Sequence, residues 1–281
     1  MKSILIVLGI LLGLFLIGWL GFQITPQGYP ATGDTGAQMD LSPVPEGLPQ
    51  PVENFYHEVY GGEMPVVSSA VISGRGTMRI KGLTMPVRWR FTYRAGKDYR
   101  HQIQTTWFGL PLLKVNEVYQ GGAGRLELPF VVSEGPKVNQ GANLGLWAEA
   151  IWMPSLWLTD PAVSWEALDE HTAVLAVPFG EKHQRFVVRF DPQTGMIRMM
   201  ESMRFKGEGS ESKTLWLNQV RQWGEMDQTL IPVDVTLTWL DEGAPWAELS
   251  VDSIAYNIDV EEAFTARKQR AVGAWKITSE E

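Results

Sequence analysis

The sequence predicts a mainly β protein with antiparallel strands, preceded by one hydrophobic helix. Three observations lead to this prediction: an uncharged N-terminal run, a period of two in the apolar residues, and turn residues at regular intervals. The period is clearest at 87–94, where every second residue is apolar and the residues between are Arg or Thr. One face of this strand is therefore expected to be buried and the other to face water.

The hydrophobic run covers residues 3–24 and carries no charged side chain. As a helix it spans about 33 Å, slightly more than the roughly 30 Å hydrocarbon core of a bilayer. We predict a transmembrane signal anchor at 1–25 that contacts the membrane through this run. A cleaved signal peptide is the alternative, but the run ends in bulky residues without an A-x-A-like site. Because Lys2 precedes the run and the next basic residue is Arg75, the N-terminus is expected in the cytoplasm.

The segment after the anchor predicts a linker and a short helix. Residues 26–50 are rich in Pro and Gly and lack apolar periodicity, which predicts an extended spacer that holds the domain off the bilayer. Residues 51–60 begin with Pro and are followed by two Gly, as in a short helix. Phe55, Val59 and Tyr60 would face inward, so this helix is expected to act as a lid or edge cover.

The main domain is predicted at 51–260, followed by a C-terminal tail at 261–281. Within the tail, 263–268 is a candidate short helix, and its acidic pairs are interpreted as solvated surface. About 11 to 12 strands are expected in the domain, separated by turns rich in Gly, Asp and Pro. The candidate strands lie at about 67–80, 87–94, 98–108, 112–120, 124–131, 163–168, 172–179, 184–191, 196–206, 213–224, 231–241 and 246–257.

One segment, 143–154, interrupts the β pattern. It is too rich in Ala, Leu and Trp for an exposed loop and predicts a helix across one face of the sheet, ended by its proline. Glu149 lies among apolar residues there, so it is a buried carboxylate that anchors a ligand head group, a solvated residue, or part of a structural ion pair. We favour the ion pair, with Arg88, Arg90 or Arg189 as the partner.

Aromatic and Met residues gather on this helix and on several strands. They would suit an adaptable lipophilic pocket, because Met fills irregular space and Trp offers broad apolar faces. Core packing explains them equally well, and a cavity of several hundred Å³ between helix and sheet would favour the ligand. The candidate ligand-binding residues are Trp147, Glu149, Trp152, Met153, Trp157, Trp89, Phe91 and Met200.

Composition and motifs exclude several classes of function. The chain has no Cys, which excludes disulfides, zinc–thiolate sites and lipid attachment to a cysteine. Its net charge of −8 without a basic run argues against nucleic acid as a partner. His57, His101, His171 and His183 lack metal-ligand spacing and are expected on the surface. No catalytic or phosphate-binding motif is present, so no catalytic residue, metal or cofactor is predicted.

Four short motifs resemble a known family: Pro-Val at 51–52, Gly-Arg-Gly at 74–76, LWAEAIWMP at 146–154 and Val-Ser-Trp at 163–165. Together they resemble a family of uncharacterised bacterial domains, a domain of unknown function, that is similar in layout to the Lol-type lipoprotein carriers. The resemblance runs over about 51–258. It implies a half-barrel, in which short helices cover the concave face of a curved antiparallel sheet and a cavity holds lipid or acyl chains. Lol carriers are free or lipid-anchored, whereas a peptide anchor is predicted for this chain, so shuttling between membranes is not expected.

The leading interpretation is a membrane-tethered, extracytoplasmic domain of the bacterial envelope that binds a lipid or another lipophilic ligand without catalysis. Its localisation would be the cell membrane, crossed once. One alternative is an interaction or sensing module that docks on an envelope protein and has a filled core. The other is a hydrolase with an unrecognised site at Glu149.

Overall fold

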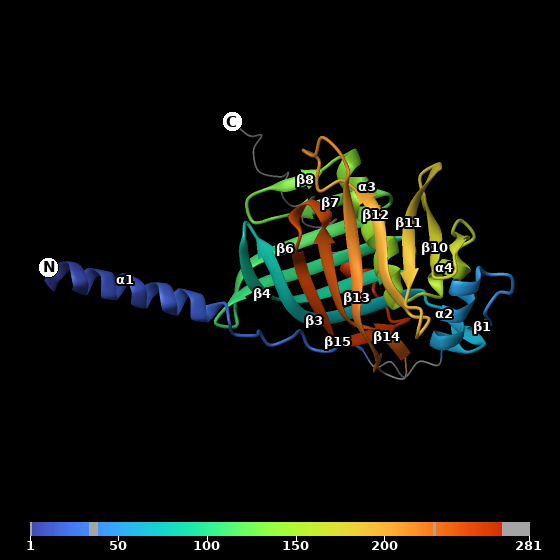
Figure 1. Cartoon of the computed structure of the whole chain (residues 1–281), viewed down its shortest axis with the longest axis horizontal. Helices are drawn as coiled ribbons and strands as arrows, with labels where there is room; N and C mark the ends of the chain where they lie inside the picture. The colour runs from blue at the N-terminus through green and yellow to red at the C-terminus, as the bar shows by residue number, and fades with distance from the viewer. Residues whose placement is uncertain (1, 34–38, 227–228, 266–281) are drawn as a thin grey trace, which may run out of the picture.

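The computed structural model describes residues 2–33, 39–226 and 229–265, and its main feature is one large, curved antiparallel sheet (Figure 1). The sheet has 13 strands in the order β8-β7-β6-β5-β4-β3-β15-β14-β13-β12-β11-β10-β9. Its strands are β3 (Ser69–Ile80), β4 (Leu83–Arg94), β5 (Asp98–Trp107), β6 (Leu110–Gln120), β7 (Ala123–Glu127), β8 (Val132–Glu134), β9 (Ser164–Asp169), β10 (Thr172–Phe179), β11 (Lys182–Phe190), β12 (Ile197–Arg204), β13 (Thr214–Met226), β14 (Thr229–Trp239) and β15 (Pro245–Tyr256). The predicted fold class, a mainly β half-barrel, is confirmed. The expected strand at 124–131 differs, because β7 turns after residue 127 and returns as β8.

Two meanders, β3 to β8 and β9 to β15, meet where β3 pairs with β15. At this seam the backbones approach closely. A Cβ atom on Gly76 would lie 2.0 Å from the backbone oxygen of Glu248, and one on Gly74 would lie 2.0 Å from that of Ser250. Real Cβ atoms do not tolerate such distances, so glycine is required there. The Gly-Arg-Gly motif therefore permits the pairing that joins the two halves of the sheet.

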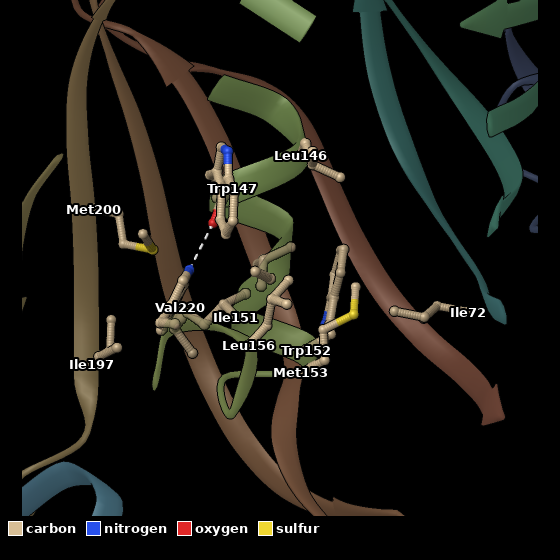
Figure 2. Packing of buried hydrophobic residues seen from close by; sticks show 14 of the residues in the cluster. Ile72, Leu146, Trp147, Ile151, Trp152, Met153, Leu156, Ile197, Met200 and Val220 are labelled. Atoms are coloured by element: carbon tan, nitrogen blue, oxygen red, sulfur yellow. Dashed lines mark hydrogen bonds between the residues drawn. The ribbon is translucent and has the colours of Figure 1, made fainter. Parts of the chain in front are cut away.

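Helix α3 (Pro136–Glu149) lies inside the curve of the sheet, followed by the 3-10 turn η1 (Ala150–Trp152) and by α4 (Leu156–Thr159). Figure 2 shows Trp147, Ile151 and Trp152 pointing from α3 and η1 into the surrounding core. The predicted helix is confirmed, but it begins seven residues before 143, at Pro136. Its first half is polar and contains glycine, and tertiary hydrogen bonds compensate for this weak helix propensity.

Those hydrogen bonds come from two buried amides of α3. Gln140 Nε2 donates to the backbone oxygen of Met203 on β12 at 3.0 Å. Asn143 Nδ2 donates to the backbone oxygen of Pro178 on β10, also at 3.0 Å. Buried amides are costly without partners, so these contacts fix the position of the helix against the second meander.

Helix α2 (Gln50–Tyr60) covers one end of the sheet beside a small two-stranded sheet of β1 (Leu41–Pro43) and β2 (Glu63–Pro65). Phe55 is fully buried, with its ring 5.7 Å from that of Trp223. Tyr56, which was not expected to face inward, is also fully buried and donates from its hydroxyl to the backbone oxygen of Pro154 at 2.9 Å. Val59 and Tyr60, both expected inward, are half-buried.

Helix α1 (Lys2–Gly21) projects away from the sheet with its side chains exposed (Figure 1). By length and composition it can cross a membrane, although a signal sequence near an N-terminus meets the same criteria. The predicted hydrophobic helix at the N-terminus is therefore confirmed.

The chain that directly follows α1, where an extended spacer was expected, contacts the sheet. Arg88 and Arg90 of β4 lie over the ring of Tyr29, at 4.8 Å and 4.9 Å from its centroid. Arg90 Nη2 also donates to the backbone oxygen of Pro30 at 2.6 Å. The outward arginines of β4 thus bind the linker to the convex face of the sheet. Residues 34–38 of the expected spacer lie outside the described residues.

The expected tail is helical over 261–265, and its remainder lies outside the described residues. Phe264 is buried beside Val71 and Val260. Arg94 lies over the Phe264 ring at 4.3 Å and pairs with Glu261 at 2.5 Å. The start of the tail therefore packs on the outer face of the sheet.

Candidate ligand-binding site

A cavity of about 440 Å³ lies between α3 and the concave face of the sheet. This volume falls within the roughly 300–1,000 Å³ typical of small-molecule sites. Apolar side chains form most of its wall, among them Phe91, Ile103, Val115, Val138, Trp152 and Leu249. The helix and the sheet are therefore not packed tightly against each other along their whole contact.

Three of the eight predicted ligand-binding residues, namely Phe91, Glu149 and Trp152, line this cavity. Met200 lines a smaller neighbouring pocket together with Glu149 and Trp152. The other four, Trp89, Trp147, Met153 and Trp157, are fully buried in the surrounding core. Figure 2 includes the hydrogen bond between two of them, in which Trp157 Nε1 donates to the Trp147 backbone oxygen at 3.1 Å. These four residues support the wall from behind.

The polar part of the wall is a buried cluster centred on His101. Its Nε2 lies 2.9 Å from Oε2 of Glu149, and its Nδ1 lies 3.8 Å from Oε2 of Glu117. Tyr93 donates from its hydroxyl to Glu149 at 3.0 Å, and Tyr99 donates to Glu117 at 2.7 Å. The five side chains come from β4, β5, β6 and α3, so the cluster ties the helix to the first meander.

The imidazole of His101 is protonated in this setting. Burial lowers the pKa of His101, but the charge of Glu149 and hydrogen bonds to Glu117 and Glu149 outweigh it and raise the pKa to about 9. The ring also stacks between Phe91 at 3.9 Å and Tyr99 at 4.0 Å, an arrangement that favours a cation.

The carboxyl group of Glu117 is correspondingly ionised. Burial raises its pKa, whereas hydrogen bonding to His101, the charges of His101 and Arg204, and the hydroxyl of Tyr99 together lower it to about 2. A buried ion pair with additional hydrogen bonds results, and it holds its charge from acidic to mildly alkaline pH.

Two predictions about this cluster require correction. His101 was expected on the surface but is 4% exposed, whereas His57, His171 and His183 are exposed as expected. Glu149 does form a buried ion pair, but its partner is His101.

None of the three arginines proposed as partners reaches Glu149, because they lie on the outer face of the sheet. Arg88 Nε donates to Gln104 at 2.9 Å and Arg189 Nε donates to Glu201 at 2.7 Å. Arg90 binds the linker at Pro30, as described above. In its strand, each arginine lies between two residues whose side chains point toward α3 and the core. Successive side chains of a strand point to opposite faces, so the arginine points away from Glu149.

Arg204, at the end of β12, supplies a second cation to the wall. Its guanidinium lies 4.2 Å from the ring centroid of Trp216 and 5.7 Å from that of Trp239. Within the described residues, its Nε and the indole Nε1 atoms of Trp216 and Trp246 are buried without a hydrogen-bond acceptor. All three residues line the cavity, so this part of the wall presents unpaired donors.

Two glycines of α3, Gly141 and Gly145, line the cavity one helical turn apart. A Cβ on Gly141 would lie 3.1 Å from Nε of Arg204, and one on Gly145 would lie 3.5 Å from the hydroxyl of Tyr99. Glycine inside a helix costs about 1 kcal/mol relative to alanine. At Gly141 a side chain would require Arg204 to shift, whereas at Gly145 an added Cβ would make an ordinary van der Waals contact.

The side chains around the cavity determine what chemistry the site can perform. A histidine that stays protonated at neutral pH cannot accept a proton, so His101 is not poised as a general base. Within the described residues, no group of three or more His, Cys, Asp or Glu side chains could hold a metal ion. What the site offers is an apolar volume, an ion cluster of His101 with Glu117 and Glu149, and unpaired donors around Arg204.

Sequence reasoning missed His101, Glu117, Tyr99 and Arg204. A signal for the first three was present, because His101 shares its alternating face with Tyr99 and Ile103 on β5. Glu117 likewise alternates in phase with Val115 and Tyr119 on β6. Arg204 carries no comparable local signal, since it ends its strand beside Trp216 of the next one.

Residues 40–249 match the family of unknown function DUF6544. The chain belongs to this family. The match covers most of the β domain and confirms the family membership inferred from the motifs, among them those at 74–76 and 146–154. No curated protein matches the chain.

Among solved structures, the chain is similar to a LolA superfamily protein from Nitrosomonas europaea, at 10% identity over 76% of this chain and 96% of that one, with a TM-score of 0.47. It is also similar to a DUF1329 family protein from Desulfovibrio piger, at 11% identity over 71% and 90% of the two chains, with a TM-score of 0.42.

Proposed function

We propose that this protein is a membrane-tethered, extracytoplasmic binding protein that holds a lipid or another long apolar molecule in the cavity between α3 and the sheet. The observation that carries the proposal is the cavity of about 440 Å³ with its mainly apolar wall. Binding would be driven by burial of apolar surface, at roughly 25 cal/mol per Å². In this proposal α1 is retained as a signal anchor, with Lys2 in the cytoplasm.

The unpaired donors around Arg204 indicate the kind of ligand. Arg204 Nε, Trp216 Nε1 and Trp246 Nε1 are buried without acceptors, and a ligand that supplies oxygen acceptors would satisfy them. A carboxylate, phosphate or ester at one end of an acyl chain has this chemistry. We therefore expect an amphiphile whose polar end meets Arg204 and whose chain extends along Phe91 and Trp152.

The two alternative functions receive less support. An interaction module with a filled core does not need the cavity. A hydrolase centred on Glu149 would need this carboxylate as a base or nucleophile, whereas it is engaged by His101 at 2.9 Å and by the hydroxyl of Tyr93 at 3.0 Å. The ion cluster is better explained as the polar base of a binding site that also locks α3 to the sheet.

The test uses the full chain, purified from membranes in mild detergent. Native mass spectrometry would detect copurified lipid, and titration with a fluorescent long-chain fatty acid would measure binding. The Arg204→Met variant should bind the fatty acid about tenfold more weakly, as expected for one charged hydrogen bond. The matched control is Arg221→Met on the next strand, which is exposed and pairs with Glu248. A protein that carries no lipid and does not bind the probe would refute the proposal.

A further inference from the structure

The turn between β7 and β8 is an exposed apolar tip. Phe130 is 93% exposed, more than any other large hydrophobic side chain among the described residues. Leu128, Val131 and Val132 on either side are 43%, 58% and 50% exposed. A run of apolar side chains without cover on a soluble surface is unfavourable, and such patches mark contacts with proteins or membranes.

The turn between β5 and β6 carries a second apolar tip, and this one is bound to the end of α1. Trp107 Nε1 donates to the backbone oxygen of Gly18 at 3.0 Å, and the Phe108 amide donates to that of Gly21 at 2.8 Å. Leu110 on the same tip is 68% exposed. The domain therefore meets the helix through this hairpin.

These bonds complete the end of the helix. The last four carbonyls of any α-helix lack partners within it. In α1 the carbonyls of Trp19 and Leu20 accept from the amides of Phe22 and Gln23, and the hairpin supplies the donors for the other two. A helix end at a membrane surface needs such partners, because lipid offers none.

The contact with α1 fixes the depth of the hairpin. Gly18 lies inside the uncharged run that ends at residue 24. If that run spans the bilayer, a side chain bonded to Gly18 lies near the outer edge of the hydrocarbon layer, below the head groups. Trp107 and Phe108 are aromatic, as is common at this level.

The cavity opens at the same end of the sheet. Its wall includes the exposed residues Lys81, in the turn between β3 and β4, and Leu128, in the turn between β7 and β8. At its other end it reaches the buried Trp152. In the meander, the turns after β3, β5 and β7 all lie at one end of their strands, the end toward α1 in Figure 1.

We propose that the tips at 80–83, 107–112 and 128–132 dock on the outer surface of the bilayer that α1 crosses, with Phe130 inserted among the lipid chains. The cavity mouth then faces the head groups, and an amphiphile passes between bilayer and cavity without crossing water. This inference rests on the proposed function, because docking requires that α1 is a retained span and ligand transfer requires that the cavity binds an amphiphile.

The experiment measures lipid contact at single cysteines, which the absence of native Cys makes straightforward. Full-length Phe130→Cys and Leu110→Cys are labelled with a polarity-sensitive fluorophore and reconstituted in vesicles of phosphatidylethanolamine and phosphatidylglycerol that contain a quencher-bearing lipid. The matched control is Gln120→Cys, an exposed position at the opposite end of the strand that begins at Leu110, roughly 34 Å away. Phe15→Cys, in the middle of α1, reports whether the helix spans the bilayer.

Docking predicts blue-shifted emission and lipid quenching at 110 and 130, with neither at 120. Water-like emission at 110 or 130, while 15 is quenched, would overturn the docking proposal and leave the tether intact. Absence of quenching at 15 would overturn the tether and the docking together.

A second measurement separates docking from ligand binding. Phe130→Ser should slow the loading of a fluorescent fatty acid from vesicles at least about tenfold, because the variant loses the burial of one large apolar side chain. Its affinity for the same probe in detergent should equal that of the wild type, since Phe130 does not line the cavity. Unchanged loading from vesicles would contradict the proposal.

Discussion

Nε2 of His101 on β5 lies 2.9 Å from Oε2 of Glu149 at the end of α3. This contact joins the inner helix to the first meander, just as the buried amides of Gln140 and Asn143 join it to the second. The His101 side chain is 5% exposed and that of Glu149 is 18% exposed, so both charges are largely shielded from water. Two tyrosine hydroxyls and a second carboxylate stabilise the pair. The ion cluster and the apolar packing therefore both hold α3 against the sheet.

The first prediction concerns pH. The folded-state pKa of His101 is about 9, above its ordinary value of 6.5. The group therefore contributes stability that is complete below pH 6.5 and is lost as the pH rises through 9, an effect of about 3 kcal/mol. His101→Gln should lose this contribution, so its free energy of unfolding should fall below that of the wild type by more at pH 6 than at pH 10.

Urea unfolding of the full chain in detergent measures both values. His183→Gln is the matched control, because His183 lies exposed on β11 and should show little difference from the wild type at either pH. A gap between His101→Gln and the wild type that stays constant from pH 6 to pH 10 would mean that the histidine is not charged in the fold.

The second prediction concerns the seam between the two meanders. Gly76→Ala would bring a Cβ atom to 2.0 Å from the backbone oxygen of Glu248, and backbone cannot move as cheaply as a flexible side chain. We expect a loss of at least about 2 kcal/mol in the free energy of unfolding. Gly62→Ala, with open space around its Cβ position, is the control. Equal stability of the two variants would show that the seam can relax.

The sequence predicted the sheet well because its strands alternate strictly and end in clear turn residues. It predicted a helix at 143–154 but missed the segment from Pro136 to Ala142. That segment has weak helix propensity and is held in the helix by the tertiary hydrogen bonds of Gln140 and Asn143. The candidate site was less predictable. Which strand faces α3 depends on the curvature of the whole sheet, and no local pattern encodes it.

The partner of Glu149 illustrates this limit. Arginine was the natural choice for a buried carboxylate, and three arginines were available on predicted strands. Alternation alone placed Arg88 and Arg90 opposite the buried face of β4 and placed His101 inside, beside Tyr99 and Ile103. An arginine is the more common partner of a buried carboxylate, but the direction in which each strand residue points decides which cation reaches Glu149, and that cation is His101.

The third prediction concerns Trp152, which separates the cavity from the core. Its ring stacks on Trp89 at 5.8 Å, and its Nε1 donates to the backbone oxygen of Pro232 at 2.9 Å. Trp152→Ala should enlarge the cavity and lower the free energy of unfolding by about 3–5 kcal/mol. Urea unfolding checks this value against Met203→Ala, where the side chain is 49% exposed and a loss below about 1 kcal/mol is expected. Similar losses in both variants would indicate that Trp152 is not part of a packed wall.

The last prediction concerns the junction between helix and domain. A Cβ atom on Gly21 would lie 2.1 Å from Nε1 of Trp107, so Gly21→Ala should displace the indole and weaken its hydrogen bond to Gly18. The Phe108 amide, which donates to Gly21, should then exchange its hydrogen at least about tenfold faster. Gly18→Ala is a close control, because its Cβ position is open and its carbonyl remains available. Hydrogen exchange of the full chain in proteoliposomes measures this difference. Equal exchange at Phe108 in both variants would mean that the hairpin is not held by the helix end, and that the linker contacts of Tyr29 alone fix the domain near the membrane.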